Sequence, residues 1–115
     1  MGLTQPSYIQ GHSFRRLLKG KTPPEWPQVA YHRSWTHRDA IHDARAHYGI
    51  RKQRYKLICW YNKGFGLPGK KLGGEETEWE LFDCDNDSLE LINIYEDIQY
   101  VKIVRTMTAE LNKRW

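Results

Sequence analysis

Four histidines recur at five-residue intervals in the first half of this 115-residue chain: His32, His37, His42 and His47. Imidazoles are common metal ligands, so the repeat raises the question of a zinc site. A five-residue interval, however, places the rings neither on one face of a helix nor on one side of a strand. The pattern therefore favours separate roles for the histidines, and we predict no metal site in the chain.

Two other patterns resemble ligand-binding motifs. The segment 64–69 is rich in glycine and precedes two lysines, as in a phosphate loop, but Lys71 stands where a hydroxyl is required and Pro68 lacks an amide donor. Asp83, Asp85 and Asp87 alternate like the first ligands of a calcium loop, whose turn glycine and final glutamate are missing. We interpret the first segment as a hairpin loop and the second as a hydrogen-bonded turn.

The cysteines suggest no catalytic or metal site. Cys59 and Cys84 lack CxxC spacing, and Cys59 is predicted to be a buried strand residue. A bridge between the two cysteines stays open, because the sequence does not reveal the redox compartment.

The elements that position these residues centre on one strand. From Arg54 to Tyr61 the residues alternate between two sides, and both sides carry large apolar groups, so we expect a central strand packed on each face. The preceding Gly49 is expected to let the backbone turn His47 out of the sheet. Weaker alternation predicts strands over 29–35 and 78–82 and an extended segment over 92–95, with 36–46 as a loop.

Helical periodicity appears at both ends of the chain. A stripe of apolar residues predicts a C-terminal helix, and its members are Tyr100, Ile103, Val104, Met107 and Leu111. Ser13 is expected to cap a short helical turn whose residues Phe14, Leu17 and Leu18 bury against the sheet, and Ser88 to cap another. Together the elements predict an α+β fold, a small antiparallel sheet packed against a C-terminal helix.

Composition limits the classes of partner. Lys and Arg outnumber Asp and Glu by 18 to 14, a surplus too small to predict nucleic-acid binding. No apolar run reaches membrane-spanning length, and the N-terminus lacks the basic and apolar regions of a signal peptide. We therefore expect no nucleic-acid partner, no membrane partner and no targeting signal.

Several blocks of sequence, in order, resemble a known family. They are IQGHSF at 9–14 with LLKGKTP at 17–23, YHRSW at 31–35, AHYGIR-x-x-RYKLI at 46–58 and EWELFD-x-x-ND-x-x-E-x-x-N-x-Y at 78–95. Nearly the whole chain resembles the C-terminal part of a type I sulfatase, of the N-sulfoglucosamine sulfohydrolase and bacterial arylsulfatase type. The resemblance implies a sheet of four antiparallel strands packed against a C-terminal helix and appended to an α/β catalytic core. Lys52 and Ser88 depart from the usual pattern without changing this assignment.

The resemblance also implies what this chain lacks. Such sulfatases hydrolyse sulfate esters with a C/S-x-P-S/A-x-R motif, oxidised to formylglycine, beside a calcium ion. Neither cysteine here is followed by proline two positions on. We expect calcium and formylglycine to belong to a missing catalytic core, in the same chain or a separate one, and no catalysis by this chain alone. The implied organisation is a lead-in and short helix over 1–28, joining that core, and a C-terminal subdomain over 29–115. The compartment stays open, since related sulfatases are mostly periplasmic, secreted or lysosomal.

Within such an enzyme the C-terminal part helps to wall the substrate pocket. His47 is the first candidate for contact with a sulfated carbohydrate, because the nearby glycine lets the backbone approach the core and an imidazole bonds to hydroxyl or sulfate groups. Trp35, His37 and Arg51 are weaker candidates. Each also has a structural alternative: Arg51 pairs with a carboxylate near the strand start, or Trp35 packs in the core.

The competing interpretation is a free-standing basic module that binds a sulfated or other polyanionic ligand. Its basic residues are Arg15, Arg16, Lys70 and Lys71. A piece of a sulfatase is expected to expose the apolar face that met the core, whereas an independent module is not. That face is expected to include one side of the sheet with Phe14, Leu17 and Trp26.

Overall fold

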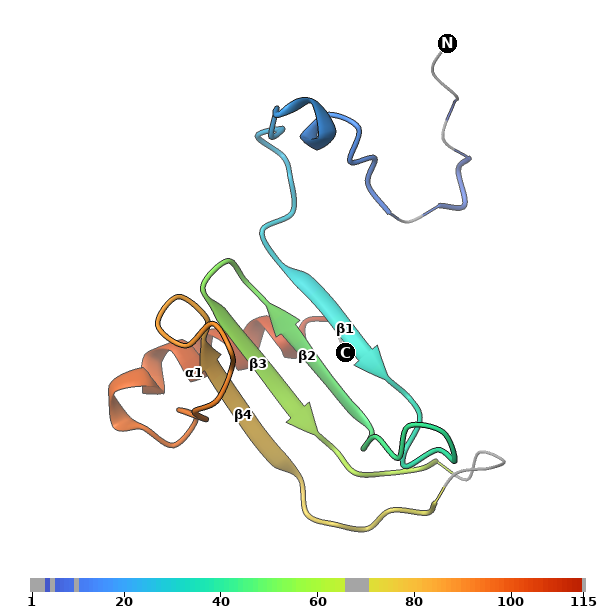
Figure 1. The fold of residues 1–115 in the computed structure, drawn as a ribbon, viewed down its shortest axis with the longest axis vertical. Helices are drawn as coiled ribbons and strands as arrows, with labels where there is room; N and C mark the ends of the chain where they lie inside the picture. Colours follow the sequence, from blue (N-terminus) through green and yellow to red (C-terminus); the bar gives the residue numbers. More distant parts are fainter. Residues whose placement is uncertain (1–3, 5, 10, 66–70, 115) are drawn as a thin grey trace.

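The computed structural model describes residues 4, 6–9, 11–65 and 71–114, so residues 66–70 of the glycine-rich loop, Lys70 among them, lie outside the described residues. Four strands form one antiparallel sheet in the order β1-β2-β3-β4 (Figure 1). Each strand pairs with its neighbour in sequence, which makes the sheet a meander. The strands are β1 Ala30–Ser34, β2 His47–Arg51, β3 Tyr55–Trp60 and β4 Glu78–Asp83.

β3 is the central strand that the alternation predicted, and it pairs with β2 and β4. The strands expected over 29–35 and 78–82 are confirmed as β1 and β4. The expectation for Gly49 is wrong, because this glycine lies inside β2, between His32 on β1 and Ile58 on β3. The backbone there is extended and continues the ladder of hydrogen bonds, so residues 47–51 form β2, the strand that the alternation did not predict.

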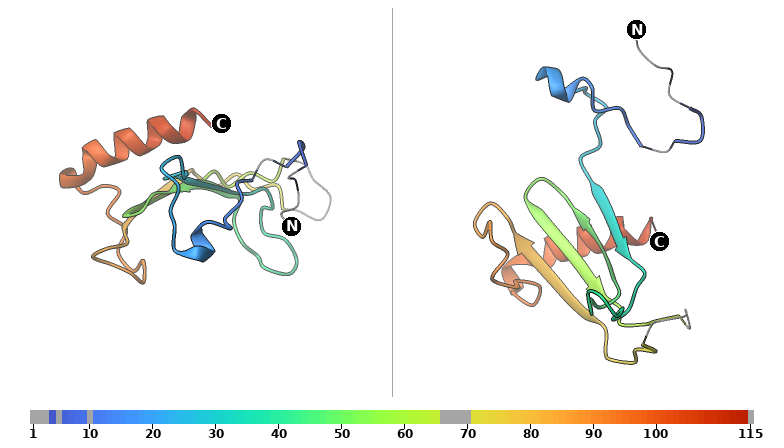
Figure 2. Two further views of the ribbon diagram at one scale, coloured as in Figure 1. Left: turned by 90° about the horizontal axis from the view of Figure 1, so that it is seen from above. Right: turned by 45° about the vertical axis from the view of Figure 1, so that its right-hand side comes forward.

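The C-terminal stripe forms the predicted helix, α1 Val101–Asn112, preceded by the 3-10 turn η2 Ile98–Tyr100. α1 covers one face of the sheet, as the view from above shows (Figure 2). The buried core between helix and sheet consists of Ile50, Leu57, Leu81, Met107 and Leu111. The predicted α+β architecture is therefore confirmed. None of the helices within the described residues is long and apolar enough to cross a membrane.

Asp83, at the end of β4, joins this strand to the start of β3. Its carboxylate accepts hydrogen bonds from Arg54 Nε at 2.9 Å, Arg54 Nη2 at 2.7 Å and Asn86 Nδ2 at 2.8 Å. Its main-chain oxygen accepts from the N–H groups of Asn86 and Asp87, which confirms the predicted turn. The hydrogen bonds to its carboxylate, with the Arg54 guanidinium contributing most, lower the pKa of Asp83 to about 2.

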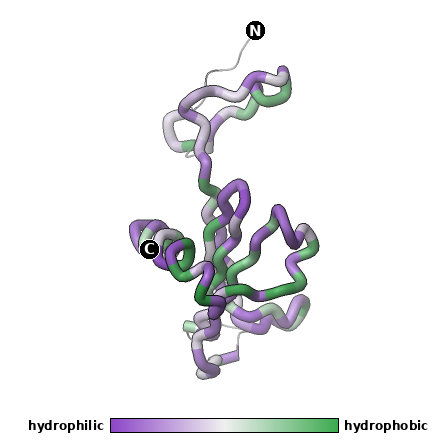
Figure 3. Tube along the Cα trace, turned by 90° about the vertical axis from the view of Figure 1, so that its left-hand side faces the viewer, coloured by the Kyte–Doolittle hydropathy of each residue, from purple (hydrophilic) through white to green (hydrophobic). Residues whose placement is uncertain are grey.

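The segment after this turn corrects one prediction. Ser88 does not begin a helical turn, and Leu89 is 75% exposed. The chain instead runs beside β4, where the Ile94 N–H donates to the Leu81 carbonyl oxygen at 2.9 Å and the Asn93 side chain accepts from the Leu81 N–H at 3.0 Å. These bonds satisfy the edge of β4 and favour an extended path over a helical one. Figure 3 shows this segment and α1 on opposite faces of the sheet.

The described residues before β1 form an arm that leads away from the sheet (Figure 1). A 3-10 turn, η1 Leu17–Lys19, ends at Gly20 with φ of 70°, as predicted, but its N-cap is Arg16 and not Ser13. The expected burial of this turn against the sheet is wrong, because Phe14 is 60% exposed and Leu18 is 76% exposed. The proline-rich connector 21–27 separates η1 from the sheet, and it makes a turn in which the Trp26 N–H donates to the Pro23 carbonyl oxygen at 3.0 Å.

Both cysteines are free thiols. Cys59 is buried on β3, as predicted, and burial raises the pKa of its thiol. Cys84 follows β4 and is partly buried.

Candidate functional site

Three of the four predicted site residues lie at one end of the sheet. The last residue of β1 pairs with His47, the first residue of β2, and Trp35 and His37 follow β1 directly in the chain. Arg51 ends β2 and pairs with the first residue of β1. The fold therefore brings Trp35, His37 and His47 to one end of the sheet and places Arg51 at the other.

His47 lies on the sheet face opposite α1, and its neighbours fix its orientation. Nδ1 lies 2.8 Å from the Arg45 carbonyl oxygen, which only accepts, so Nδ1 carries a proton. The ring centre lies 4.4 Å from that of Trp60 and 5.8 Å from that of His32. Nε2 is thus the ring nitrogen left for a ligand. It accepts from a hydroxyl when the imidazole is neutral and donates when the imidazole is charged.

Gly49 provides the space that the His32 ring occupies. A Cβ atom at Gly49 would meet the Leu57 carbonyl oxygen and would lie 2.7 Å from His32 Cε1. The glycine therefore admits a ring beside His47, whereas the sequence suggested that it freed the backbone. Burial, with the proximity of His47 second, lowers the pKa of His32, so this imidazole is neutral at neutral pH.

A groove of about 490 Å³ crosses this face. Within it, Trp60 Nε1 donates to Glu80 Oε2 at 2.7 Å, and Lys56 Nζ donates to Glu90 Oε2 at 2.6 Å. The groove is lined by His32, His47, Lys56, Ile58, Trp60, Glu80, Phe82 and Glu90. It combines aromatic surface with fixed donors and acceptors, an arrangement that suits a polar ligand with an apolar ring face, such as a sugar.

Sequence reasoning identified only His47 among the groove residues. A signal for part of the groove was present, because the alternation in β3 already placed Lys56 and Trp60 on one side. The register of β4 then adds Glu80, which pairs with Ile58. Glu90 carried no comparable signal, since it reaches the groove from the irregular segment after β4.

Neither Trp35 nor Arg51 makes the structural contact that was considered as the alternative to ligand binding. Trp35 is 56% exposed, so it is not a core residue, and its ring centre lies 3.4 Å from the Arg33 guanidinium carbon in a cation–π contact. Arg51 Nη1 donates to the Lys52 carbonyl oxygen at 2.7 Å, and the carboxylate near the start of β3 pairs with Arg54 instead. A role for Trp35 or Arg51 in ligand binding stays a prediction.

The histidine repeat divides into separate environments, as the spacing favoured. His32 and His47 lie side by side on the groove face, His37 is fully buried, and His42 is exposed and bonds to Asp39. Among the residues described by the structure, no three His, Cys, Asp or Glu side chains gather in a group that could hold a metal ion. The predicted ligand contact at His37 stays a prediction, although its imidazole is enclosed by this chain.

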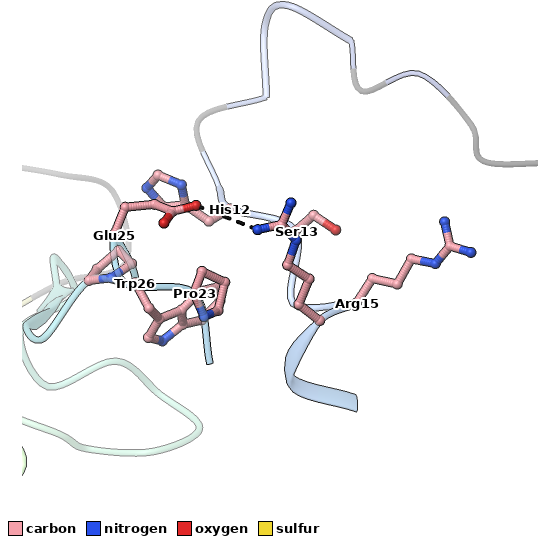
Figure 4. Close-up of a pocket in the computed structure, with 8 residues that line it drawn as sticks. His12, Ser13, Arg15, Pro23, Glu25 and Trp26 are labelled. Carbon is pink, nitrogen blue, oxygen red and sulfur yellow. Dashed lines mark ion pairs between the residues drawn. The ribbon is translucent and has the colours of Figure 1, made fainter. Parts of the chain in front are cut away.

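The arm carries a second, smaller cavity of about 320 Å³. Figure 4 shows His12, Pro23 and Trp26 on one side of it and Arg15 on the other, with a dashed line for the ion pair of Arg16 and Glu25 at 3.9 Å. The side chains of that pair are 70% and 75% exposed, so solvent weakens the attraction between their charges. The cavity therefore lies in a loosely packed and basic part of the chain.

Comparisons with known proteins agree with the fold and with the resemblance. The chain is 37% identical over 103 residues to an N-acetylglucosamine-6-O-sulfatase of Bacteroides thetaiotaomicron, a match that covers 88% of this chain and 16% of the relative. A solved structure, BT4656 in complex with its substrate D-glucosamine-2-N,6-O-disulfate, covers 97% of this chain with a TM-score of 0.77 and 32% identity. This chain spans only 20% of that structure's chain. The family model of the N-sulphoglucosamine sulphohydrolase C-terminal region matches residues 1–115, and the chain belongs to this family.

Proposed function

We propose that this chain works as the C-terminal subdomain of a sulfuric ester hydrolase, where it forms scaffold and substrate-pocket wall beside a catalytic core. The family match supports the proposal, as does the small share of the relatives' length that the chain spans. The residues present do not fit the catalytic groups of such enzymes, because Cys59 and Cys84 both lack the proline of the formylglycine motif. We therefore expect no sulfate-ester hydrolysis by this chain alone.

The observation that carries the proposal is the placement of the His47 and Trp60 rings at one end of the groove, with their centres 4.4 Å apart and their planes tilted by 47°. The indole is held by Glu80 and the imidazole by the Arg45 carbonyl oxygen, so both rings are oriented before a ligand arrives. A sugar ring can lie on the indole while His47 Nε2 bonds to a hydroxyl or sulfate oxygen. Lys56 lies on the same face and keeps N–H donors there, although Glu90 neutralises its charge. These features suit a sulfated carbohydrate.

The proposed catalytic core lies against the groove face. On that face the segment after β4 exposes Leu89, Leu91 and Ile92 by 75%, 75% and 64%, whereas Ile58 and Phe82 line the groove but are only 6% and 7% exposed. Exposed apolar surface of this kind marks an interaction site. Of the arm residues expected on the exposed apolar face, Phe14 is 60% exposed, whereas Leu17 and Trp26 are partly buried. With the core on this side, the groove would be one wall of a pocket between the two parts.

A binding experiment tests the groove. We expect D-glucosamine-2-N,6-O-disulfate, added to the ¹⁵N-labelled 115-residue chain, to shift the NMR signals of His47, Trp60 and Glu80 before any others. His47→Ala should weaken binding about tenfold, since a hydrogen bond to a charged group contributes about 1.5–3 kcal/mol. His42→Ala is the matched control, because His42 is exposed and outside the groove. Equal affinity of the two variants, or no binding at millimolar sugar, would contradict the proposed contact.

A second candidate function, binding of a polyanion by a basic module, is favoured by the charge of the arm. Residues 1–29 contain four Lys or Arg and one Glu, a net charge of +3 out of +4 for the whole chain. Lys71, by contrast, lies 3.7 Å from Asp43 and is partly neutralised. Arg15, Arg16 and the aromatic surface of Trp26 therefore form the basic site proposed for this function.

The double variant Arg15→Gln, Arg16→Gln tests this candidate. We expect it to leave a heparin column at a clearly lower salt concentration than the unmodified chain, because salt screens contacts between exposed charges. Lys102→Gln with Arg105→Gln, on the exposed side of α1, removes the same net charge and should change the elution less. The same shift for both double variants would show that only net charge matters, which is evidence against a site in the arm.

A further inference from the structure

The residue before His47 is held on both sides by hydrogen bonds from distant segments. Ala46 is fully buried. Its N–H donates to His37 Nδ1 at 3.3 Å, and its carbonyl oxygen accepts from the Asn62 N–H at 3.4 Å. His37 lies after β1 and Asn62 lies after β3, so the chain entering β2 is fixed between the two neighbouring connections.

The hydrogen bond to Ala46 determines where the His37 proton lies. A backbone N–H only donates, so Nδ1 of His37 accepts and the proton of the neutral ring is on Nε2. Nε2 lies 3.4 Å from Glu75 Oε2 in an electrostatic contact that is not an aligned hydrogen bond. The ring is fully buried. His37 is thus oriented by groups on both of its nitrogens.

One peptide group connects His37 with His47. The N–H of Ala46 and the C=O of Arg45 belong to the same planar unit, in which they point in opposite directions. The N–H donates to His37 Nδ1, and the C=O accepts the proton of His47 Nδ1. Because the unit is rigid, the bond at His37 fixes the direction of the carbonyl group that orients His47. Hydrogen bonds in such a chain also polarise and strengthen one another.

Asn62 holds the same peptide segment from the other side. Its φ of 52° lies in the left-handed region, which asparagine tolerates better than most residues. Its Nδ2 donates to the Glu76 carbonyl oxygen at 2.6 Å, and its main-chain oxygen accepts from the Gly74 N–H at 3.2 Å. The conformation of Asn62 is therefore anchored by the connection between β3 and β4.

We propose that His37 is a positioning residue that acts through the Arg45–Ala46 peptide group, keeping the proton of His47 on Nδ1 and its Nε2 directed at a ligand in the groove. The part of this inference that concerns a ligand rests on the proposed function. The link between the two histidines stands on the geometry alone. His37 thus acts behind the binding site, which accounts for its complete burial.

Two substitutions separate this role from simple packing. In His37→Asn the side-chain oxygen occupies the place of Nδ1 and still accepts from the Ala46 N–H. His37→Gln puts its polar atoms at the place of Nε2 and loses that acceptor. We expect ¹⁵N NMR of the unmodified chain to show the proton of His37 on Nε2 and that of His47 on Nδ1. The Asn variant should keep the His47 tautomer, and the Gln variant should change it to a mixture while weakening the ring-current shift from Trp60.

The tautomer of His47 is measured without a ligand, so the result does not depend on the proposed function. An unchanged His47 tautomer in His37→Gln would overturn the inference. A proton on His37 Nδ1 in the unmodified chain would also overturn it, and this second measurement decides the question if neither variant folds. With D-glucosamine-2-N,6-O-disulfate as the probe, the Gln variant should lose about tenfold in affinity and the Asn variant should not. If the sugar does not bind while the tautomer shifts, the proposed function fails and the positioning link stands.

Discussion

Replacing Gly49 with alanine is expected to destabilise the folded chain by about 3 kcal/mol, because the added methyl group has no space in a well-packed sheet. Its Cβ would meet the backbone carbonyl oxygen of Leu57, which cannot move without breaking the ladder between β2 and β3, and it would press on the His32 ring. The change would also disturb His47, two residues away in the same strand. A loss of this size is a large part of the stability of a small domain, about 5–15 kcal/mol.

Urea denaturation followed by tryptophan fluorescence measures this effect. The matched control is Gly11→Ala, since a Cβ at Gly11 would meet nothing within 4 Å. We expect the control to unfold at the urea concentration of the unmodified chain. A midpoint for Gly49→Ala within error of that value would show that β2 yields to the methyl group, contrary to the steric argument.

The second large effect is expected from Asp83→Asn, which removes the charge that binds the Arg54 guanidinium through two hydrogen bonds. Asp83 is only 4% exposed, and it joins the end of β4 to the start of β3. We expect the melting temperature at pH 7 to fall by about 5–10 °C, a typical response when a chain of this size loses one important interaction.

The lowered pKa of Asp83 also predicts the direction in which stability changes with pH. The pKa of Asp83 is about 2 in the folded chain and lies below its ordinary value of about 3.9 in the unfolded chain. The unfolded state therefore binds more protons between these values, and the stabilisation present above pH 4 is lost as the pH falls towards 2. Melting curves between pH 2 and 5 should show a steeper acid loss for the unmodified chain than for Asp83→Asn. Parallel acid limbs would contradict the role of the Arg54 pair.

The sequence by itself determined the elements with a clear period. Alternation identified β1, β3 and β4, and the apolar stripe identified α1, because side chains on one face of an element must bury together. The aspartates predicted the turn at Asp83, since short acidic side chains bond to nearby backbone groups. The motifs of the resemblance pointed to the sulfatase family, which the family match confirms. His47 was also singled out from sequence and proves to lie in the groove.

Other features were decided only by the tertiary structure. β2 was missed because its glycine is required by contact with the Leu57 carbonyl oxygen and the His32 ring, and a close approach between strands leaves no mark on local periodicity. The helical turn expected after Ser88 did not form, because hydrogen bonds to the edge of β4 hold the chain there in an extended path. The turn expected after Ser13 formed as η1, but its N-cap is Arg16 and its apolar residues do not reach the sheet. The groove and the link from His37 to His47 join residues from several segments. Such contacts depend on strand register and on loop closure, which only the folded chain defines.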